Sequence, residues 1–290
     1  MVNLSDFLVV GGDLRQVSVA NRLYEHGYNV GVFSLCDTSA LKRHITVCGS
    51  IDECVNTDAV ILPLPCSSDG DRISGTDIKL YELFERLPKG CVVFGGKITE
   101  KIRSIGNVYG LELTDYFGSD TVEIKNAVPT AEGAIGLAMN ETLTTIHGSS
   151  CLVLGFGRIS KILSRLLYHM GAHVTVAARK KSDLAWIGAL GYTAADINSP
   201  ETLTAYHDII FNTVPVCILN EHILRQISRN TLIIDLASRP GGVDFNAARE
   251  LGISAHHALS LPGKVAPVTA GEVICDAILE IIKERSKFTP

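Results

Sequence analysis

Short apolar runs alternate with segments of helical periodicity along most of the chain, and this alternation limits the folds that it can adopt. In the N-terminal half, the run at 7–10 enters the turn Gly11-Gly12-Asp13, and apolar residues then recur at helical spacing from Leu14 to Tyr24. The other runs of this half lie at 29–33, 59–64, 91–96 and 107–111. Because short strands separated by helices are typical of parallel sheets built from βα units, we expect an α/β fold.

The C-terminal half repeats this alternation with different segments. Its strand-like runs lie at 151–155, 173–178, 208–214 and 231–237. An apolar stripe from Ile159 to Met170 predicts an amphipathic helix between the first two runs. A linking helix is predicted where apolar residues recur from Ile135 to Ile146. A last helix is predicted around 273–282, with Thr269 and Glu272 as its capping box. We expect two domains joined by helices, with a cleft for substrate between them.

Composition excludes several classes of protein. The chain has 290 residues and a net charge of −5, so it has no general attraction for nucleic acid. No apolar run approaches the roughly 18 residues of a membrane span, and Asp6 and Asp13 flank an N-terminal apolar stretch too short for a signal peptide. The eight cysteines lack metal-ligand spacing and are interpreted as small buried apolar residues. We expect a cytoplasmic protein without a metal site.

The segment 151–160, CLVLGFGRIS, has the pattern of a dinucleotide-binding turn: a strand, a glycine-rich turn and an amphipathic helix. Gly155 permits the tight turn, and Gly157 lets the backbone approach a pyrophosphate at the positive end of the helix. Ser160 replaces the third glycine and is small enough to keep the helix near the strand. The alternative is an ordinary glycine turn. The candidate cofactor contacts here are Gly155, Phe156, Gly157, Arg158 and Ile159.

The end of the next strand indicates which nicotinamide cofactor binds. NAD sites have an acidic residue there that accepts hydrogen bonds from the ribose, but the strand at 173–178 is followed by Arg179 and Lys180, with no acid before Asp183. A guanidinium group can bind a 2′-phosphate through two parallel hydrogen bonds, so the residues favour NADP over NAD. The alternative is that Arg179 is a solvated surface charge.

Two later loops follow strands of the same half. Loops at the carboxyl ends of parallel strands face the bound ligand in such folds, so we expect both to contact the nicotinamide, mainly through backbone groups. Pro215 has the alternative role of simply ending a strand. The candidates are Thr213, Val214 and Pro215 in the first loop, and Asp235, Ala237 and Ser238 in the second.

The turn at 11–13 is a poor dinucleotide site, because Asp13 would bring a negative charge to the phosphate position. The N-terminal half is therefore interpreted as a substrate domain with a flavodoxin-like arrangement. Arg15 is a candidate anion clamp within it, and the alternative is a surface arginine.

Six strings taken together resemble the A-subunit family of dipicolinate synthases from spore-forming bacteria. They are GGDLRQ (11–16), NAVPTAEGAIGLAM (126–139), GFGRIS (155–160), NTVP (212–215), DLASRPGGVDF (235–245) and LPGKVAPVTAGEVI (261–274). The resemblance implies NADP-dependent oxidation of dihydrodipicolinate to dipicolinate (pyridine-2,6-dicarboxylate). It also implies a partner, the flavoprotein-like B subunit of the synthase, and action in the mother cell during sporulation.

The plan of the chain is also similar to alanine dehydrogenases and to the formate/glycerate dehydrogenase type. In those folds the C-terminal helix returns to the first domain, so the resemblance implies that 268–290 completes a substrate domain at 1–128. Residues 129–267 would then form a Rossmann domain together with the linking helix. The family usually has a glycine where this chain has Ser160.

A dicarboxylate substrate requires cationic partners, and its aromatisation requires loss of a proton. Glu132 is the candidate base, placed at the start of the linking helix; its alternative role is that of a first-turn acid that favours the helix dipole. His256 and His257, after a strand-like run, are the runners-up. Each candidate cation has the alternative of being an ordinary surface charge. The cations lie in or beside glycine-rich turns and are Arg15, Lys97, Arg239 and Lys264.

Two other functions stay open on the sequence alone. One is a non-catalytic, nucleotide-binding subunit that regulates or scaffolds its partner. The other is a related dehydrogenase of amino, hydroxy or folate substrates. The sequence also leaves the oligomeric state open, including a homo-oligomer.

Overall fold

The computed structural model describes residues 4–53 and 57–288, which fall into two compact units. The first unit comprises residues 1–126 and 266–290, and the second comprises residues 127–265. These boundaries lie beside the expected ones at 128/129 and 267/268. In the described part of the chain, no helix combines the length and the apolar character that crossing a membrane requires.

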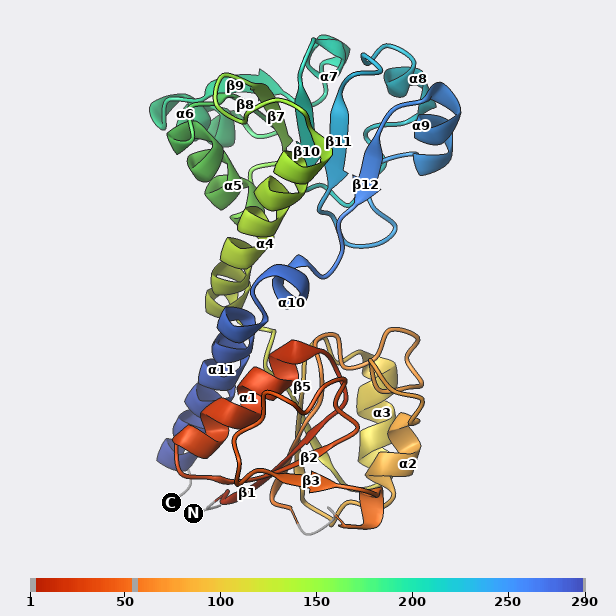
Figure 1. Ribbon diagram of the computed structural model, residues 1–290, viewed down its shortest axis with the longest axis vertical. Helices are drawn as coiled ribbons and strands as arrows, with labels where there is room; N and C mark the ends of the chain where they lie inside the picture. The colour runs from red at the N-terminus through yellow and green to blue at the C-terminus, as the bar shows by residue number, and fades with distance from the viewer. Residues whose placement is uncertain (1–3, 54–56, 289–290) are drawn as a thin grey trace. The chain divides into compact units, whose positions relative to one another are not determined.

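The first unit is a six-stranded parallel sheet with helices on both faces. Helices α1 and α11 cover one face, and α2 and α3 cover the other (Figure 1). Its elements are β1 (Asp6–Val10), α1 (Leu14–Glu25), β2 (Asn29–Phe33), β3 (Thr46–Cys48), a 3-10 turn (Ile51–Glu53), β4 (Ala59–Ile61), α2 (Leu80–Phe84), β5 (Val92–Gly95), α3 (Glu100–Val108), β6 (Glu112–Asp115) and α11 (Pro267–Phe288).

The strand order of this sheet is β3-β2-β1-β4-β5-β6. Without the short edge strand β3, the order is the flavodoxin-like one that the sequence predicts. With β3, it is also the order typical of dinucleotide-binding folds. The first unit therefore shares its topology with the second.

The second unit is another six-stranded parallel sheet, in the order β12-β11-β10-β7-β8-β9. Apolar side chains of α4, α5 and α6 pack on one face, and those of α7, α8 and α9 pack on the other. Helix α4 begins in the first unit and continues into the second. The elements are α4 (Asp120–Glu141), β7 (Ser150–Leu154), α5 (Arg158–His169), β8 (His173–Ala178), α6 (Lys181–Ala189), β9 (Thr193–Asp196), α7 (Pro200–Thr204), β10 (Ile209–Asn212), α8 (Glu221–Leu224), β11 (Leu232–Asp235), α9 (Phe245–Leu251), β12 (Ala255–His257) and α10 (Leu261–Val265).

Both faces of each sheet are buried, which is why the central strands are apolar at nearly every position. In β1, Phe7 and Val9 pack towards α1 and α11, whereas Leu8 and Val10 pack towards α2 and α3. The edge strands β3, β9 and β12 are short and partly exposed, so they lack the apolar signal that marks the others.

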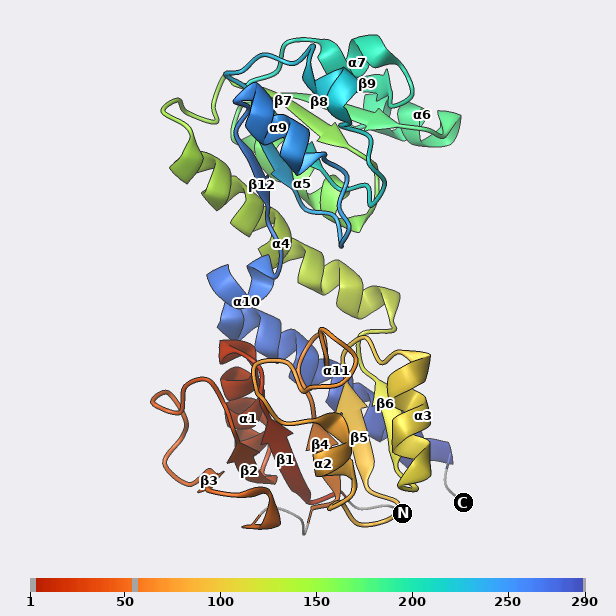
Figure 2. The ribbon, with the colours of Figure 1, turned by 90° about the vertical axis from the view of Figure 1, so that its right-hand side faces the viewer.

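Helix α11 packs closely along α1, as the resemblance implies for the C-terminal helix (Figures 1 and 2). A Cβ atom at Gly271 would lie 2.5 Å from the backbone oxygen of Arg15 and 2.5 Å from Ser18 Cβ, so only glycine permits this approach. Beside the contact, Arg22 Nη2 lies 2.9 Å from Asp276 Oδ1. The C-terminal helix is thus an integral part of the first unit.

Three predicted elements are wrong in position. Residues 107–111 do not form a strand, because α3 continues to Val108 and Gly110 then turns the chain at φ +69°. The linking helix ends at Glu141, so Thr142, Leu143 and Ile146 lie beyond it. Helix α11 begins at Pro267, whose ring favours the first turn of a helix, so Thr269 lies inside the helix and the capping box does not form.

The cysteines divide into two groups. Cys66, Cys91, Cys151 and Cys275 are buried, as predicted, and burial raises the pKa of the last three thiols to about 12. The prediction is wrong for the exposed Cys36 and Cys217 and for Cys48, which takes part in a disulfide. Cys54, the eighth cysteine, lies outside the described residues.

Candidate functional site

The glycine turn between β7 and α5 is crowded at its first glycine and open at its second. Gly155 has φ +98°, and a Cβ atom there would lie 2.6 Å from Thr213 Oγ1, so a larger residue would be both strained and crowded. Gly157 is the N-cap of α5, has no side chain to cap the helix, and would place a Cβ atom in open space. The start of this 12-residue helix therefore fits a phosphate group.

Ser160 explains how the turn functions without a third glycine. Its side chain is fully buried, and its Oγ donates a hydrogen bond of 2.6 Å to the carbonyl oxygen of Gly155. The hydroxyl thus ties the first turn of α5 to the glycine turn, which preserves the close packing of helix and strand. On the outer side, Lys161 Nζ lies 5.0 Å from the centre of the Phe156 ring.

Three cations follow β8, at the position where the sequence predicts that the cofactor is selected. Arg179, Lys180 and Lys181 are exposed, and none forms an ion pair with another residue that the structure describes. The sheet order also brings in an acid that sequence reasoning missed. Asp196 ends β9 as the register partner of Ala178, and its Oδ1 accepts hydrogen bonds from Asn198. Two signs of charge therefore meet at this end of the sheet.

The two loops after β10 and β11 are held by hydrogen bonds of the side chains of Thr213 and Asp235. Thr213 Oγ1 donates to the Leu154 oxygen at 2.7 Å, which packs the 213–215 loop on the glycine turn. Asp235 is fully buried, so its carboxylate cannot reach a ligand in solvent and instead accepts hydrogen bonds from its own loop. The exposed part of that loop is Ser238-Arg239-Pro240.

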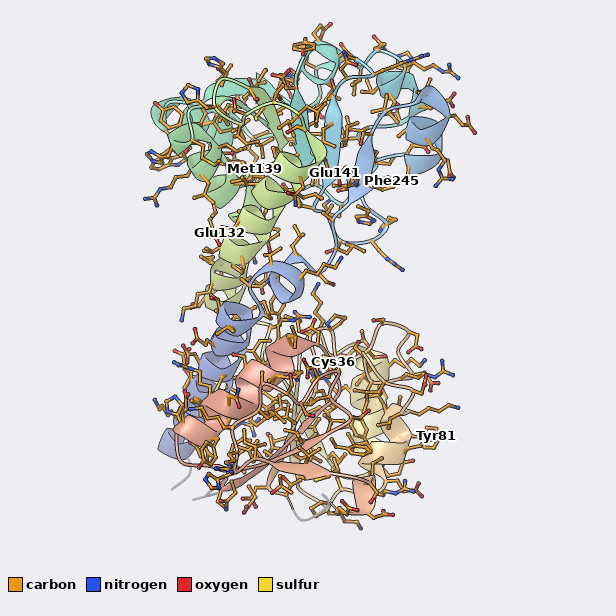
Figure 3. All side chains as sticks on the ribbon, viewed as in Figure 1. Cys36, Tyr81, Glu132, Met139, Glu141 and Phe245 are labelled. Carbon is orange, nitrogen blue, oxygen red and sulfur yellow. The ribbon has the colours of Figure 1, made fainter. Side chains whose placement is uncertain are left out.

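Glu132 does not lie where the sequence predicts. Helix α4 begins at Asp120 and runs through Pro129, so Glu132 is exposed in mid-helix and is not a first-turn acid (Figure 3). The proline suggests a helix start, but the helix tolerates it in its interior. Both sequence interpretations of Glu132 relied on a helix start at this point and are wrong in that respect.

The two histidines lie within strand β12 rather than after it. His257 Nε2 is 2.9 Å from the carbonyl oxygen of Ala237, and its ring stacks on Phe245 at 5.3 Å. Because a carbonyl only accepts, Nε2 carries the proton and Nδ1 is the nitrogen left to act as a base. His256 Nε2 lies 3.4 Å from Glu141 Oε2.

The candidate cations have different surroundings. Arg239 and Lys264 are exposed, and neither has an ion-pair partner in the described part of the chain. Lys97 is exposed too, has φ +58°, and its Nζ lies 5.6 Å from the Phe117 ring centre. Arg239, Lys264 and Lys97 are therefore able to bind an anion.

Arg15 is neither a surface arginine nor an unpaired clamp. It is only 7% exposed; its Nε and Nη2 each lie 2.8 Å from a carboxylate oxygen of Asp13, and Nη2 also donates to the Leu64 oxygen at 2.7 Å. Burial raises the pKa of Asp13, but its hydrogen bonds and its attraction to Arg15 outweigh this and leave the pKa below its usual value. The charge of Arg15 is therefore already balanced.

The glycine turn of the first unit is filled by the protein itself. Gly12 N donates to the Ser74 oxygen at 2.8 Å, and a Cβ atom at Gly75 would lie 2.8 Å from the Gly12 oxygen. The Asp13 carboxylate caps α1 by accepting from Arg15 N at 3.0 Å. Among the residues that the structure describes, this turn thus offers a diphosphate neither the space nor the N–H groups that it needs.

Comparison with known proteins identifies the family. The model of the N-terminal domain of the dipicolinate synthase A subunit matches residues 6–117. The dipicolinate synthase A subunit of Bacillus subtilis (strain 168) is 36% identical in an alignment of 289 residues, and 95% of each chain is covered. The chain belongs to the dipicolinate synthase A-subunit family.

Solved structures agree with this family. The dipicolinate synthase A subunit from Bacillus halodurans is 30% identical, with 97% of this chain and 98% of that chain covered and a TM-score of 0.87. An L-alanine dehydrogenase structure, 13% identical, covers 98% of this chain and 90% of its own with a TM-score of 0.70. The fold of this family is therefore shared with dehydrogenases of the alanine dehydrogenase type.

Proposed function

We propose that this chain is the A subunit of a dipicolinate synthase and oxidises dihydrodipicolinate to dipicolinate with reduction of NADP. The observation that carries the proposal is the uncapped start of α5 after a glycine turn, in a member of this family. Three cations, Arg179 to Lys181, follow in the next βα unit and have no ion-pair partner among the described residues. An open helix start binds a diphosphate, and the cations provide the partner for a further phosphate.

The reaction transfers two electrons. A bound nicotinamide would supply the oxidation by accepting a hydride from a ring carbon of the substrate; with loss of a proton from the ring as well, the product would be an aromatic pyridine. Backbone groups at 155–159 would hold the diphosphate, and Arg179 and Lys180 would bind the 2′-phosphate. The loops at 213–215 and 235–238 would orient the nicotinamide. The product's aromaticity makes proton loss favourable, so a weak base is sufficient.

The substrate carboxylates need cationic partners, and Arg239, Lys264 and Lys97 are the side chains that we assign to them. Arg15 is the weakest of the four candidates, because Asp13 already balances its charge. Glu132 and His257 Nδ1 are the candidate proton acceptors. Residues 1–128 with 268–290 form the substrate domain of this proposal, and 129–267 form the cofactor domain.

The proposal includes a partner and a place of action. The relatives are named as one lettered subunit of a synthase, which implies a second, and we take that second one to be the flavoprotein-like B subunit. The protein acts in the cytoplasm of the mother cell during sporulation.

The test is a reconstituted assay with freshly generated dihydrodipicolinate, NADP and the B subunit, in which NADPH and dipicolinate are both measured. We expect the two products in equal amounts. Absence of both, with cofactor binding intact, would refute the activity.

A second candidate function is a non-catalytic subunit that binds the cofactor and regulates its partner. It is favoured by the exposed mid-helix position of Glu132 and by the paired state of Arg15, which leave two predicted site residues without an evident catalytic arrangement. Turnover that is unchanged in Glu132→Gln, Arg239→Ala and Lys264→Ala variants would support this second function.

A further inference from the structure

Two polar side chains, Asn212 and Asp235, end neighbouring strands in the interior of the second unit. They are the last register partners of β10 and β11, and both are fully buried. A polar group is costly to bury unless its hydrogen bonds are satisfied, so such a pair has a specific role. The bonds that the two side chains make reveal that role.

Asn212 holds the loop at 213–215. Its Oδ1 accepts from Val214 N at 3.1 Å, and its Nδ2 donates to the Val214 oxygen at 2.9 Å, so one side chain binds both backbone groups of one loop residue. The same Nδ2 also donates to Asp235 Oδ1 at 2.7 Å. The amide therefore couples this loop to the one that follows β11.

Asp235 holds both ends of its own loop. Its Oδ1 accepts from Ala237 N at 3.0 Å, and its Oδ2 accepts from Gly242 N at 2.7 Å. These two N–H groups flank the exposed tip at 238–240, which contains Arg239. The carboxylate thus orders the loop from both sides, in addition to its bond with Asn212.

Gly241 and Gly242, at the end of this loop, pack directly against the side chains of Asn212 and Asp235. Gly241 has φ +93°, and a Cβ atom there would lie 2.6 Å from Asp235 Oδ2. A Cβ atom at Gly242 would lie 2.2 Å from Asn212 Nδ2 and 2.5 Å from the Val214 oxygen. The loop backbone therefore lies directly on the two side chains and has little freedom to move.

His257 provides a third anchor. Its Nε2 donates to the Ala237 oxygen, and Phe245 at the start of α9 stacks on its ring (Figure 3 labels Phe245). Ala237 is thus held by its N–H through Asp235 and by its carbonyl through His257. The residue before the exposed tip is fixed on both sides.

We propose that Asn212 and Asp235 are positioning residues that hold the guanidinium of Arg239 where it binds a carboxylate of the substrate. The assignment rests on the proposed function for its substrate class, and it deepens that function by naming the groups that set the geometry of the carboxylate site. Misplacement by about 1 Å can reduce a rate about 100-fold, so such anchors are as important as the contact itself.

The first test compares Asp235→Asn, Arg239→Ala and the double variant. Asparagine at 235 presents an NH₂ group to main-chain N–H donors, which releases one end of the loop. We expect each single change to lower kcat/KM about 10- to 100-fold and the double variant to be no worse than Arg239→Ala. If Asp235 served only general stability, the two losses would multiply, and the proposal would be wrong.

The second test does not depend on turnover. Hydrogen exchange at the Ala237 and Gly242 amides should accelerate in Asp235→Asn, and calorimetry should find weaker binding of pyridine-2,6-dicarboxylate to both Asp235→Asn and Arg239→Ala. Faster exchange with unchanged affinity in Asp235→Asn overturns the positioning role. Absence of turnover by the unaltered protein, with these binding results as expected, would instead count against the proposed reaction.

Two further variants separate the pair from its surroundings. Asn212→Asp places two carboxylates face to face and should destabilise the protein. The exchanged pair, Asn212→Asp with Asp235→Asn, should regain stability. It should not regain kcat/KM, because the N–H donors of the loop stay unsatisfied. Gly188→Ala, in α6 with no described atom within 4 Å of the added Cβ, is the matched control and should leave exchange and affinity unchanged. Recovery of full activity by the exchanged pair contradicts the proposal.

Discussion

The two units have the same strand order and the same glycine turn between first strand and first helix, but only one turn is open. At Gly12, the backbone N–H is bonded to the Ser74 oxygen, and Asp13 caps the helix. At Gly157, no side chain of the described residues caps α5, and the space beyond the Cα atom is open. A fold of this kind therefore does not by itself make a nucleotide site.

The difference arises from the residue that caps the helix and from one inserted loop. A carboxylate at the N-cap stabilises the helix start and repels a phosphate, whereas a glycine leaves the positive end of the helix unshielded. In the first unit, Ser74 and Gly75 of the segment 66–78 then cover the turn. Function is set by these local features on a common scaffold.

The largest change is expected when the glycine turn of the second unit receives the acidic helix cap of the first. Gly157→Asp should reduce NADP affinity more than about 100-fold, because the new carboxylate caps α5 and repels the diphosphate. Calorimetry would measure this. Gly188→Ala, in α6 with no described atom within 4 Å of the added Cβ, is the control and should keep the affinity. Equal affinities for the two variants would contradict the assignment of this turn.

The opposite result is expected in the first unit, where a disruptive substitution should lower the stability of the protein but leave cofactor binding unchanged. Gly271→Val forces α11 away from the backbone of Arg15 and should destabilise the protein by about 2–3 kcal/mol. Denaturant unfolding gives the value, and NADP affinity should stay unchanged. Gly136→Ala, with no described neighbour within 4 Å, is the control. An unaltered midpoint for Gly271→Val argues against the close helix contact.

Cofactor selection can be sharpened at the strand ends of the second unit. Arg179→Ala should weaken NADP binding about tenfold and leave NAD binding unchanged, because only the 2′-phosphate loses a partner. Asp196→Asn should strengthen NADP binding slightly by removing a nearby negative charge. Fluorescence of Trp186, which is 62% exposed in the following helix, reports both titrations. Equal responses to NAD and NADP before mutation would refute the preference.

The two units should also differ in how their stability depends on pH, although this effect is expected to be small. Burial lowers the pKa of His207 below its usual 6.5, more than Thr202 and Asp208 raise it, and its Nε2 has no partner among the described residues. The stability from neutral His207 is present above pH 6.5 and is lost as the pH falls through the folded pKa. Asp13, with its pKa below the usual 3.8, stabilises the first unit down to lower pH.

Acidification from pH 7 to pH 5 should therefore lower the melting temperature through the second unit. Thermal unfolding at a series of pH values measures the dependence. Because asparagine does not titrate, the His207→Asn variant should show a weaker dependence of the melting temperature on pH. A variant that retains the full slope would show that another group is responsible.

The fold class, the position of most strands and the glycine turn after β7 can be predicted from the sequence alone. Each depends on residues close together in the chain: apolar runs for buried strands, a stripe for α5, and two glycines after β7. The interpretation of Gly11-Gly12-Asp13 as a poor nucleotide turn was equally local, since Asp13 supplies the charge. Errors of the same local kind, such as the start of the linking helix, came from Pro129, which resembles a helix start.

Which polar groups meet can be seen only in the folded chain. Arg15 bonds to the Leu64 oxygen, 49 residues away, Asp196 lies beside Ala178, and Asn212 meets Asp235 across 23 residues. The chain fold and the strand register bring these residues together, and burial then requires that the hydrogen bonds of Arg15, Asn212 and Asp235 be satisfied within the protein. A local pattern contains neither piece of information, because it records spacing along the chain and not which strands become neighbours.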